Sequence, residues 1–269
     1  MKYKKIKQLT DIPYRPGNDS WRLDLAMPAD KASSPRPGLV MIHGGGWKTG
    51  DKQDSKWRDL LVEFAQQGFV TVSMNHRLSA EAVYPACLDD ASCAVRWLRA
   101  NSETYNVDPA RIGGIGESSG GQLIAMLTLT EPVVEPSAPY QDQSSVLQSA
   151  CLLATPTDFV NWTQPGEFCT RDAVAQLFTG SIETRNERAR LASPLYFARA
   201  DAPPLLIVHG TDDEIVPINQ ADRFVETLKK AGAQDVTYLR HEGVRHGIYN
   251  SLRDELLPQI SQFFDRTIT

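Results

Sequence analysis

One serine stands in a pattern that is typical of a nucleophile. The stretch Gly116-Glu117-Ser118-Ser119-Gly120 fits G-x-S-x-G and lies between an apolar run and a segment of helical composition. A sharp strand-to-helix turn leaves room only for very small residues two positions before and two positions after the reactive serine. Ser118 has a glycine at both places, whereas Ser119 would have Glu117 two positions before it. The pattern therefore indicates Ser118 as the nucleophile.

Backbone amides that could stabilise an oxyanion are expected at two places. The N–H of Ser119 stands at the start of the helix after the nucleophile and can donate to a developing negative charge. A second donor is expected just after the apolar run 38–43, where residues 44–46 are all glycine and the backbone can approach a substrate carbonyl. In acyl-transfer enzymes the loss of one such donor costs about 3 to 4 kcal/mol. His43, at the end of that run, is expected to be structural.

The sequence also offers a base and an acid in the order that this chemistry requires. A serine hydroxyl needs a histidine base whose tautomer is fixed by a carboxylate, and with G-x-S-x-G the order is Ser, acid, His. His246 is the predicted base, because it follows in a loop between two glycines. His209 precedes the candidate acids, and His241 lies inside a predicted strand. Spacing leaves three acids open, which are Asp212, Asp213 and Glu214.

Short apolar runs alternate with segments of helical periodicity along the chain. The runs that predict strands cover residues 21–28, 38–44, 69–77, 111–117, 149–155 and 203–210. Apolar residues share one face in the segments 89–105 and 220–233, and residues 122–129 form a third predicted helix. Such alternation predicts an α/β fold with a mostly parallel sheet and helices on both faces. Ligands bind at the carboxyl ends of the strands in such sheets, which is where Ser118 is expected.

Two stretches interrupt this alternation. Residues 130–149 are rich in Pro, Ser and Gln and are expected to form a long surface connection. Residues 158–194 are irregular as well, and segments of this length in a compact domain are more often functional lids than idle loops. The large aromatic residues of this second stretch are Trp162, Phe168 and Phe178. We therefore expect a single domain over residues 1–269, with a small cap or lid in residues 158–194.

Composition and charge exclude several classes of function. The formal net charge is -5, and no run of Lys and Arg follows the N-terminal residues 2–7, so a nucleic-acid partner is not expected. No stretch is long and apolar enough to span a membrane, and the N-terminus lacks the apolar segment of a secretory signal. The cytoplasm is the expected location, with secretion as the alternative if a leader was removed. Reduced, mostly buried thiols are expected at Cys87, Cys93, Cys151 and Cys169.

Taken together, the motifs resemble those of the α/β-hydrolase superfamily. Within it, they resemble the bacterial acetyl and feruloyl esterase group, which is related to the hormone-sensitive-lipase-like esterases. The resemblance extends from about Trp21 to His246. It rests on "HGGGW" (43–47), "NHRL" (75–78), "YPACLDDASCAVRWLRAN" (84–101), "VDPARIGGIGESSGG" (107–121), "HGTDDEIVP" (209–217) and "GVRHG" (243–247).

This resemblance implies roles for individual residues. In the family, H-G-x-x-D-x-x-V-P carries the catalytic acid at its fifth position, which is Asp213 here. The oxyanion donors correspond to the backbone N–H groups of Gly45, Gly46 and Ser119. Trp47, beside that loop, would form a wall of the acyl pocket or would be an ordinary packing residue. Lipase-like relatives usually carry alanine in place of Ser119, a small change that should be tolerated. They also have a long N-terminal helical cap, which the sequence does not predict here, so bulky lipid substrates are not expected.

The predicted activity is the hydrolysis of short-chain carboxylic esters by a Ser-His-Asp triad through an acyl-enzyme. The resemblance implies acetyl or feruloyl esters of carbohydrates as small-molecule substrates, and it leaves a homodimer open. A kynurenine formamidase-like amidase and a prolyl-oligopeptidase-like peptidase are alternatives within the same chemistry. A non-catalytic binding module is the alternative of another class, although all three triad residue types are present. No metal or organic cofactor is expected, because the histidines and cysteines show no ligand spacing.

Overall fold

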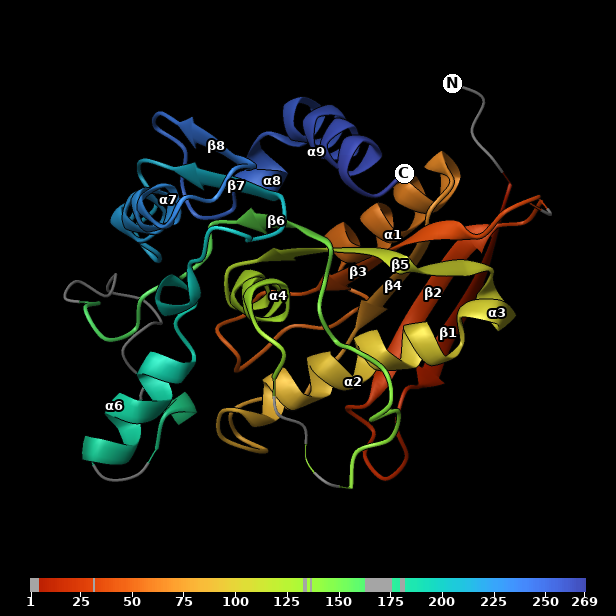
Figure 1. Cartoon of the computed structure of the whole chain (residues 1–269), viewed down its shortest axis with the longest axis horizontal. Helices are drawn as coiled ribbons and strands as arrows, with labels where there is room; N and C mark the ends of the chain where they lie inside the picture. The colour runs from red at the N-terminus through yellow and green to blue at the C-terminus, as the bar shows by residue number, and fades with distance from the viewer. Residues whose placement is uncertain (1–4, 31, 133–134, 136, 163–175, 180–181) are drawn as a thin grey trace.

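One eight-stranded β-sheet runs through the centre of the molecule (Figure 1). The computed structural model describes residues 5–30, 32–132, 135, 137–162, 176–179 and 182–269. The strands are β1 (Ile6–Pro13), β2 (Arg22–Pro28), β3 (Arg36–Ile42), β4 (Val70–Met74), β5 (Val107–Glu117), β6 (Ser149–Leu153), β7 (Leu205–Gly210) and β8 (Val236–His241). Every apolar run that predicted a strand therefore corresponds to one in the structure.

The sheet is mostly parallel, as the alternation of elements predicts. Its strands lie in the order β1-β2-β4-β3-β5-β6-β7-β8. The pairs β1–β2 and β2–β4 are antiparallel, and all pairs from β4 to β8 are parallel. The apolar pattern does not predict β1, because this edge strand has no fully buried residue and carries polar side chains at half of its positions. Strands β3, β4, β6 and β7 are buried throughout, which explains their continuous apolar sequences.

Helices cover both faces of the sheet (Figure 1). One face packs against α2 (Ala86–Ala100), α4 (Ser119–Leu129) and α7 (Asn219–Ala231), which contribute to the same buried apolar cluster. The other face packs against α1 (Ser55–Gln67), α8 (Ile248–Ser251) and α9 (Arg253–Ile268). The remaining short elements are α3 (Ser102–Tyr105), α6 (Ile182–Leu191) and the 3-10 helix η1 (Pro194–Phe197). The layered α/β class predicted from the sequence is confirmed.

The two irregular stretches differ from each other in the structure. Between α4 and β6 the described residues form neither helix nor strand, which agrees with a long connection. Residues 158–194, in contrast, contain α6, which lies apart from the sheet in Figure 1. The sequence pattern does not predict α6, because its residues IETRNERARL have no continuous apolar face. Phe178 is buried in the main cluster, whereas Phe168 lies outside the described residues.

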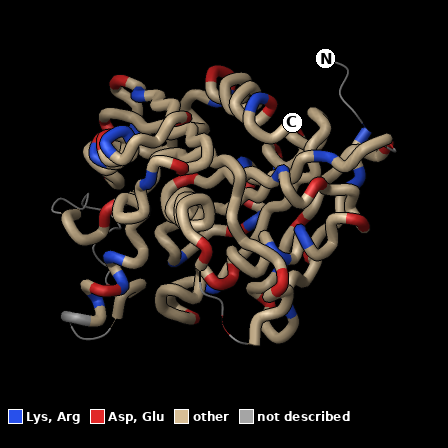
Figure 2. The backbone as a smooth tube through the Cα atoms, viewed as in Figure 1, with Lys and Arg blue, Asp and Glu red and all other residues tan. Residues whose placement is uncertain are grey.

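The distribution of charged residues and the burial of the cysteines can be compared with the expectations from the sequence. In Figure 2 neither sign of charge gathers in one region of the backbone. The predicted buried, free thiols are confirmed at Cys87, Cys93 and Cys151, and Cys169 lies outside the described residues. Among the helices of the described residues, none combines the length and the apolar character that a membrane crossing requires.

Candidate active site

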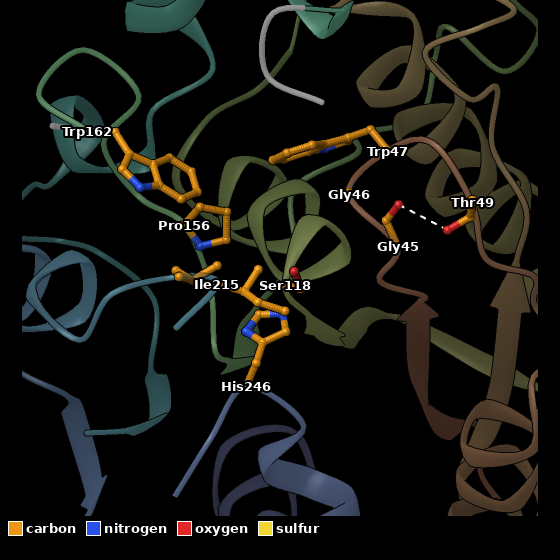
Figure 3. A pocket seen from close by; sticks show the side chains of 10 residues that line it. Gly45, Gly46, Trp47, Thr49, Ser118, Pro156, Trp162, Ile215 and His246 are labelled. Atoms are coloured by element: carbon orange, nitrogen blue, oxygen red, sulfur yellow. Dashed lines mark hydrogen bonds between the residues drawn. The ribbon is translucent and has the colours of Figure 1, made fainter. Parts of the chain in front are cut away.

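Ser118 occupies a sharp turn between β5 and α4 (Figure 3). Its backbone angles are φ 54° and ψ -122°, which residues with a side chain rarely adopt. A Cβ atom at Gly116 would lie 2.5 Å from the carbonyl carbon of Gly120, and one at Gly120 would lie 2.1 Å from the carbonyl oxygen of Ile42. Both distances are far inside van der Waals contact. The requirement for glycine on both sides of Ser118, predicted from the sequence, therefore holds in the structure.

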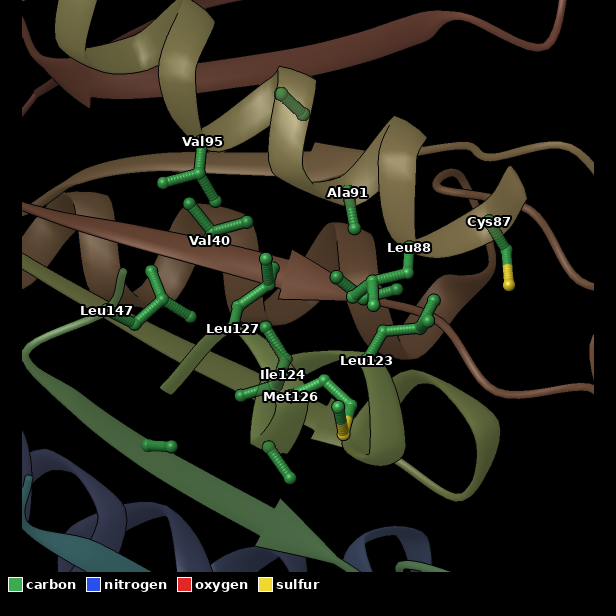
Figure 4. Packing of buried hydrophobic residues seen from close by; sticks show 14 of the residues in the cluster. Val40, Cys87, Leu88, Ala91, Val95, Leu123, Ile124, Met126, Leu127 and Leu147 are labelled. Carbon is green, nitrogen blue, oxygen red and sulfur yellow. The ribbon is translucent and has the colours of Figure 1, made fainter. Parts of the chain in front are cut away.

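Helix α4 fixes this turn because the helix itself is buried on all sides. All of its residues, from Ser119 to Leu129, are buried. In Figure 4 the side chains of Leu123 and Leu127 point from α4 towards β3 and α2, where Val40 and Leu88 lie near them. Ser119 is the first residue of the helix, so its N–H has no partner within the helix and faces the turn. A rigid helix start thus presents one amide next to Ser118.

The loop after β3 brings a second set of amides to the same place. Gly45 and Gly46 have positive φ angles of 120° and 62°. The carbonyl of Gly45 accepts hydrogen bonds from the N–H groups of Lys48 and Thr49, both at 3.1 Å, and this closes a tight turn. Among the hydrogen bonds within the described residues, none uses the N–H of Gly45 or Gly46. Both glycines line one pocket together with Ser118.

Two buried histidines lie behind this loop. The rings of His43 and His76 stack with centroids 4.8 Å apart and planes inclined by 14°. The Nδ1–H of His43 donates to the carbonyl oxygen of Gly44 at 2.8 Å, and that of His76 donates to the carbonyl oxygen of Arg77 at 3.0 Å. Burial lowers the pKa of His43, and burial together with the neighbouring His43 lowers the pKa of His76 to about 3. Both rings are neutral at neutral pH, and His43 is hydrogen-bonded to the first glycine of the loop, as expected for a structural residue.

His246 and Asp213 form a hydrogen-bonded pair. The Nδ1–H of His246 donates to Oδ2 of Asp213 at 2.8 Å. The other carboxylate oxygen, Oδ1, accepts the N–H groups of Ile215 at 2.9 Å and Val216 at 2.8 Å. Burial opposes ionisation of Asp213, but hydrogen bonds from His209 and His246 outweigh it and hold the pKa of this carboxyl well below its usual range. The ionised carboxylate therefore fixes the tautomer that leaves Nε2 of His246 free to accept a proton.

The acids and histidines that spacing left open differ in their contacts. Asp212 and Glu214 are exposed, and only Asp213 of the three acids contacts His246. His241 lies near Glu255, with its Nδ1 3.8 Å from the carboxylate, and takes no part in this pair. The loop that carries His246 can lie close to β7 because Gly210 has no side chain: a Cβ there would be 2.1 Å from the carbonyl oxygen of Val244.

These residues meet in one pocket of about 200 Å³. Ser118 and His246 both line it and lie next to each other in Figure 3. Trp47 and Trp162 stand on opposite sides of the pocket in the same view, and Pro156 lies next to Trp162 on the side towards Ser118. The full lining consists of Gly45, Gly46, Trp47, Thr49, Ser118, Pro156, Trp162, Ile215, Val216 and His246. Of the other residues predicted for the site, Asp213 is hydrogen-bonded to His246 and Ser119 directly follows Ser118 in the chain.

Two polar residues of the site were not predicted. Gln122 is fully buried, accepts a hydrogen bond from Nε1–H of Trp47 at 3.2 Å and donates one to the carbonyl oxygen of Ala192 at 2.8 Å. His209 is fully buried and contacts Asp213. For Gln122 a signal was present, since a polar residue inside an otherwise apolar helix indicates a buried hydrogen-bond partner.

The sheet, the strained serine after β5 and the histidine that follows β8 define an α/β-hydrolase fold. Solved structures support this assignment. A truncated form of a carbohydrate esterase from gut microbiota is 24% identical, with a TM-score of 0.82 over 100% of this chain and 98% of that one. Esterase Est2 of Thermogutta terrifontis, in its butyrate-bound structure, is 27% identical, with a TM-score of 0.74 over 96% of this chain and 94% of that one.

The chain belongs to the BD-FAE family, whose model matches residues 23–228. Among curated proteins it is similar to esterase LipQ of Mycobacterium tuberculosis, with 28% identity over 242 residues that cover 89% of this chain and 57% of LipQ. It is 30% identical over 234 residues to the probable carboxylic ester hydrolase LipM of the same organism, covering 85% of this chain and 52% of LipM. The chain thus spans about half the length of these curated relatives.

Proposed function

We propose that the protein is a serine carboxylesterase in which Ser118, His246 and Asp213 form the catalytic triad. The observation that carries this proposal is the pocket itself. It places a serine in a strained turn beside a histidine whose Nδ1–H is held by a buried, ionised aspartate. The names of the relatives, which are esterases, support the same chemistry.

The proposed reaction follows from this geometry. Oγ of Ser118 attacks the ester carbonyl carbon while Nε2 of His246 takes the hydroxyl proton, and Asp213 stabilises the imidazolium that forms. The resulting oxyanion accepts hydrogen bonds from the N–H groups of the Gly45–Gly46 loop and of Ser119. When the intermediate collapses, the alcohol leaves with the proton from His246. Water then attacks the acyl-enzyme by the same steps and releases the acid.

The pocket favours a short acyl group. Its volume is about 200 Å³, and the indole rings of Trp47 and Trp162 bound it on two sides. The related Est2 structure with bound butyrate is in line with this size. For the alcohol part we propose a carbohydrate, as in the carbohydrate esterase that shares the fold. Acetylated sugars are therefore the first substrates to test, and feruloylated sugars the second.

We propose further that part of residues 158–194 acts as a cap over this pocket. Trp162 lines the pocket, and its neighbour Phe159 packs edge-on against Trp47 with ring centroids 5.5 Å apart. The carbonyl of Ala192, just beyond α6, is hydrogen-bonded to Gln122 in the core. The two ends of the segment are thereby anchored at the site, as a cap requires.

The test is an ester series on the wild type and on Ser118→Ala. Hydrolysis of p-nitrophenyl esters from acetyl to decanoyl should be fastest for the shortest chains, and Ser118→Ala should lose about three orders of magnitude or more in kcat. Ser144→Ala, at an exposed serine in the connection between α4 and β6, is the matched control and should retain wild-type rates. Equal turnover by Ser118→Ala and the wild type would overturn the proposed triad.

Two further measurements separate the alternatives. N-formylkynurenine and a proline-containing peptide, assayed beside the esters, test for an amidase or peptidase. A fluorophosphonate probe should label the wild type at Ser118 and leave Ser118→Ala unlabelled. A wild-type protein that takes up no probe and cleaves no ester would favour a binding module instead.

A further inference from the structure

We propose that His209 is a positioning residue for this reaction: it competes with His246 for one carboxylate oxygen of Asp213 and thereby keeps the base available at lower pH. The inference rests on the proposed function, because it concerns the same triad. It assigns a role to a buried histidine that the reaction steps themselves do not use.

The contacts of His209 fix its tautomer. The side chain is fully buried at the end of β7, and its Nε2 lies 2.8 Å from the carbonyl oxygen of Val216 and 3.2 Å from Oδ2 of Asp213. A carbonyl oxygen can only accept, so Nε2 of His209 carries the proton. This single N–H is shared between Val216 and the carboxylate.

The other ring nitrogen of His209 makes no hydrogen bond. Nδ1 is buried and has no partner among the described residues. A proton on Nδ1 would be a buried N–H without an acceptor, so the contacts of this ring suit the tautomer that donates through Nε2. An apolar side chain of similar size would avoid the unpartnered nitrogen, which means that the polar contribution of His209 lies in its Nε2–H.

His209 and His246 therefore use the same oxygen of Asp213. Oδ2 accepts from His246 Nδ1 at 2.8 Å and is contacted by His209 Nε2 at 3.2 Å, whereas Oδ1 is held by the amides of Ile215 and Val216. These two amides keep the carboxylate in place whether or not His209 is present. Loss of the His209 donor would thus leave the geometry intact and concentrate the carboxylate charge on the bond to His246.

Among the described residues, the other charged groups near Asp213 and His246 are exposed or paired elsewhere. Asp212 and Glu214 on the same loop are exposed, and so is Arg245 beside His246. Asp158, from the segment after β6, is buried but paired with Arg223 at 2.8 Å. The carboxylate of Asp213 is therefore shared by the two imidazoles alone among these groups.

The test compares His209→Phe with His209→Gln in the pH dependence of kcat/KM for p-nitrophenyl acetate. In His209→Phe the carboxylate holds the protonated form of His246 more strongly, so the acid limb should move to higher pH by about half a unit or more. The rate on the high-pH plateau should stay within about threefold of the wild type, because Asp213 remains in place. His209→Gln, which can still donate an N–H, should keep the acid limb near its wild-type position.

The results distinguish failure of the proposed role of His209 from failure of the proposed esterase function. An unshifted acid limb in an active His209→Phe variant, with only its thermal stability reduced, would show a packing role and overturn the inference. If His209→Phe does not fold, His209→Asn takes its place, since its shorter side chain does not reach Oδ2. Failure of the proposed function would look different: the wild type itself would then take up no fluorophosphonate and hydrolyse no ester.

Discussion

The indole N–H of Trp47 donates to the side-chain oxygen of Gln122 at 3.2 Å, which ties a wall of the pocket to the helix that begins next to Ser118. The amide nitrogen of Gln122 in turn donates to the carbonyl oxygen of Ala192 at 2.8 Å. Trp47 has a positive φ of 58°, so its backbone does not favour this conformation by itself. One buried side chain therefore connects the glycine loop, α4 and the end of the proposed cap.

Gln122→Met should change the choice of acyl chain. The substitution conserves volume but leaves the N–H of Trp47 and the carbonyl of Ala192 without partners, which should cost about 1 to 3 kcal/mol of stability. Because Trp47 is then free to move, kcat/KM should fall for acetyl esters and fall less for longer chains. Chain-length profiles and urea unfolding measure both effects, with Gln259→Met on α9 as the control. An unchanged profile in a destabilised Gln122→Met would mean that the bridge is only structural.

Gly120→Ala tests the turn that presents Ser118. The added methyl group would lie 2.1 Å from the carbonyl oxygen of Ile42, so either β3 or the start of α4 has to move. We expect a loss of about 1 to 3 kcal/mol or more in the free energy of unfolding, together with loss of fluorophosphonate labelling at Ser118.

The control for this change lies in the same active-site region. Gly247 follows His246, and a Cβ there would have nothing within 4 Å. Its φ of -72° suits alanine, so Gly247→Ala should stay within about 0.5 kcal/mol of wild-type stability. Equal behaviour of the two alanine variants would contradict the steric account of the turn.

The features that could be predicted from the sequence are those that a local pattern determines. The strands β3, β4, β6 and β7 are buried throughout and are therefore mainly apolar, and the turn at Ser118 excludes all but glycine on either side. The catalytic roles assigned to Ser118, His246 and Asp213 remain predictions, but the structure brings the three residues together as the order along the chain suggested.

The features that could not be predicted are of two kinds. Some elements have no periodic apolar pattern, and some contacts join residues that are distant in sequence. Strand β1 lies at the edge of the sheet, and α6 has no continuous apolar face, so neither leaves a periodic pattern. Gln122 and Ala192 are 70 residues apart, and their hydrogen bond arises only because the end of the cap segment folds back on α4. His209 was set aside as a base by chain order, and only the folded loop shows that it contacts Asp213.

The stacked histidines predict how stability changes at acidic pH. The pKa of His76 is about 3 in the folded protein, against an ordinary value of 6.5, because burial and the adjacent His43 disfavour its charged form. Between these two pH values the unfolded chain binds a proton at this position and the folded protein does not. The contribution of the neutral, buried His76 to the free energy of unfolding is therefore fully present above pH 6.5. It decreases as the pH falls towards 3, by up to about 1.4 kcal/mol per pH unit.

His76→Phe removes this titration and keeps an aromatic ring against His43. Urea unfolding between pH 4 and pH 8 should show a shallower loss of stability in the variant than in the wild type. His43, whose pKa is also lowered by burial, acts in the same direction, so the slope should decrease without vanishing. Parallel curves for the two proteins would mean that His76 takes up its proton in the folded state as readily as in the unfolded chain. The interpretation of the stacked rings as neutral would then be wrong.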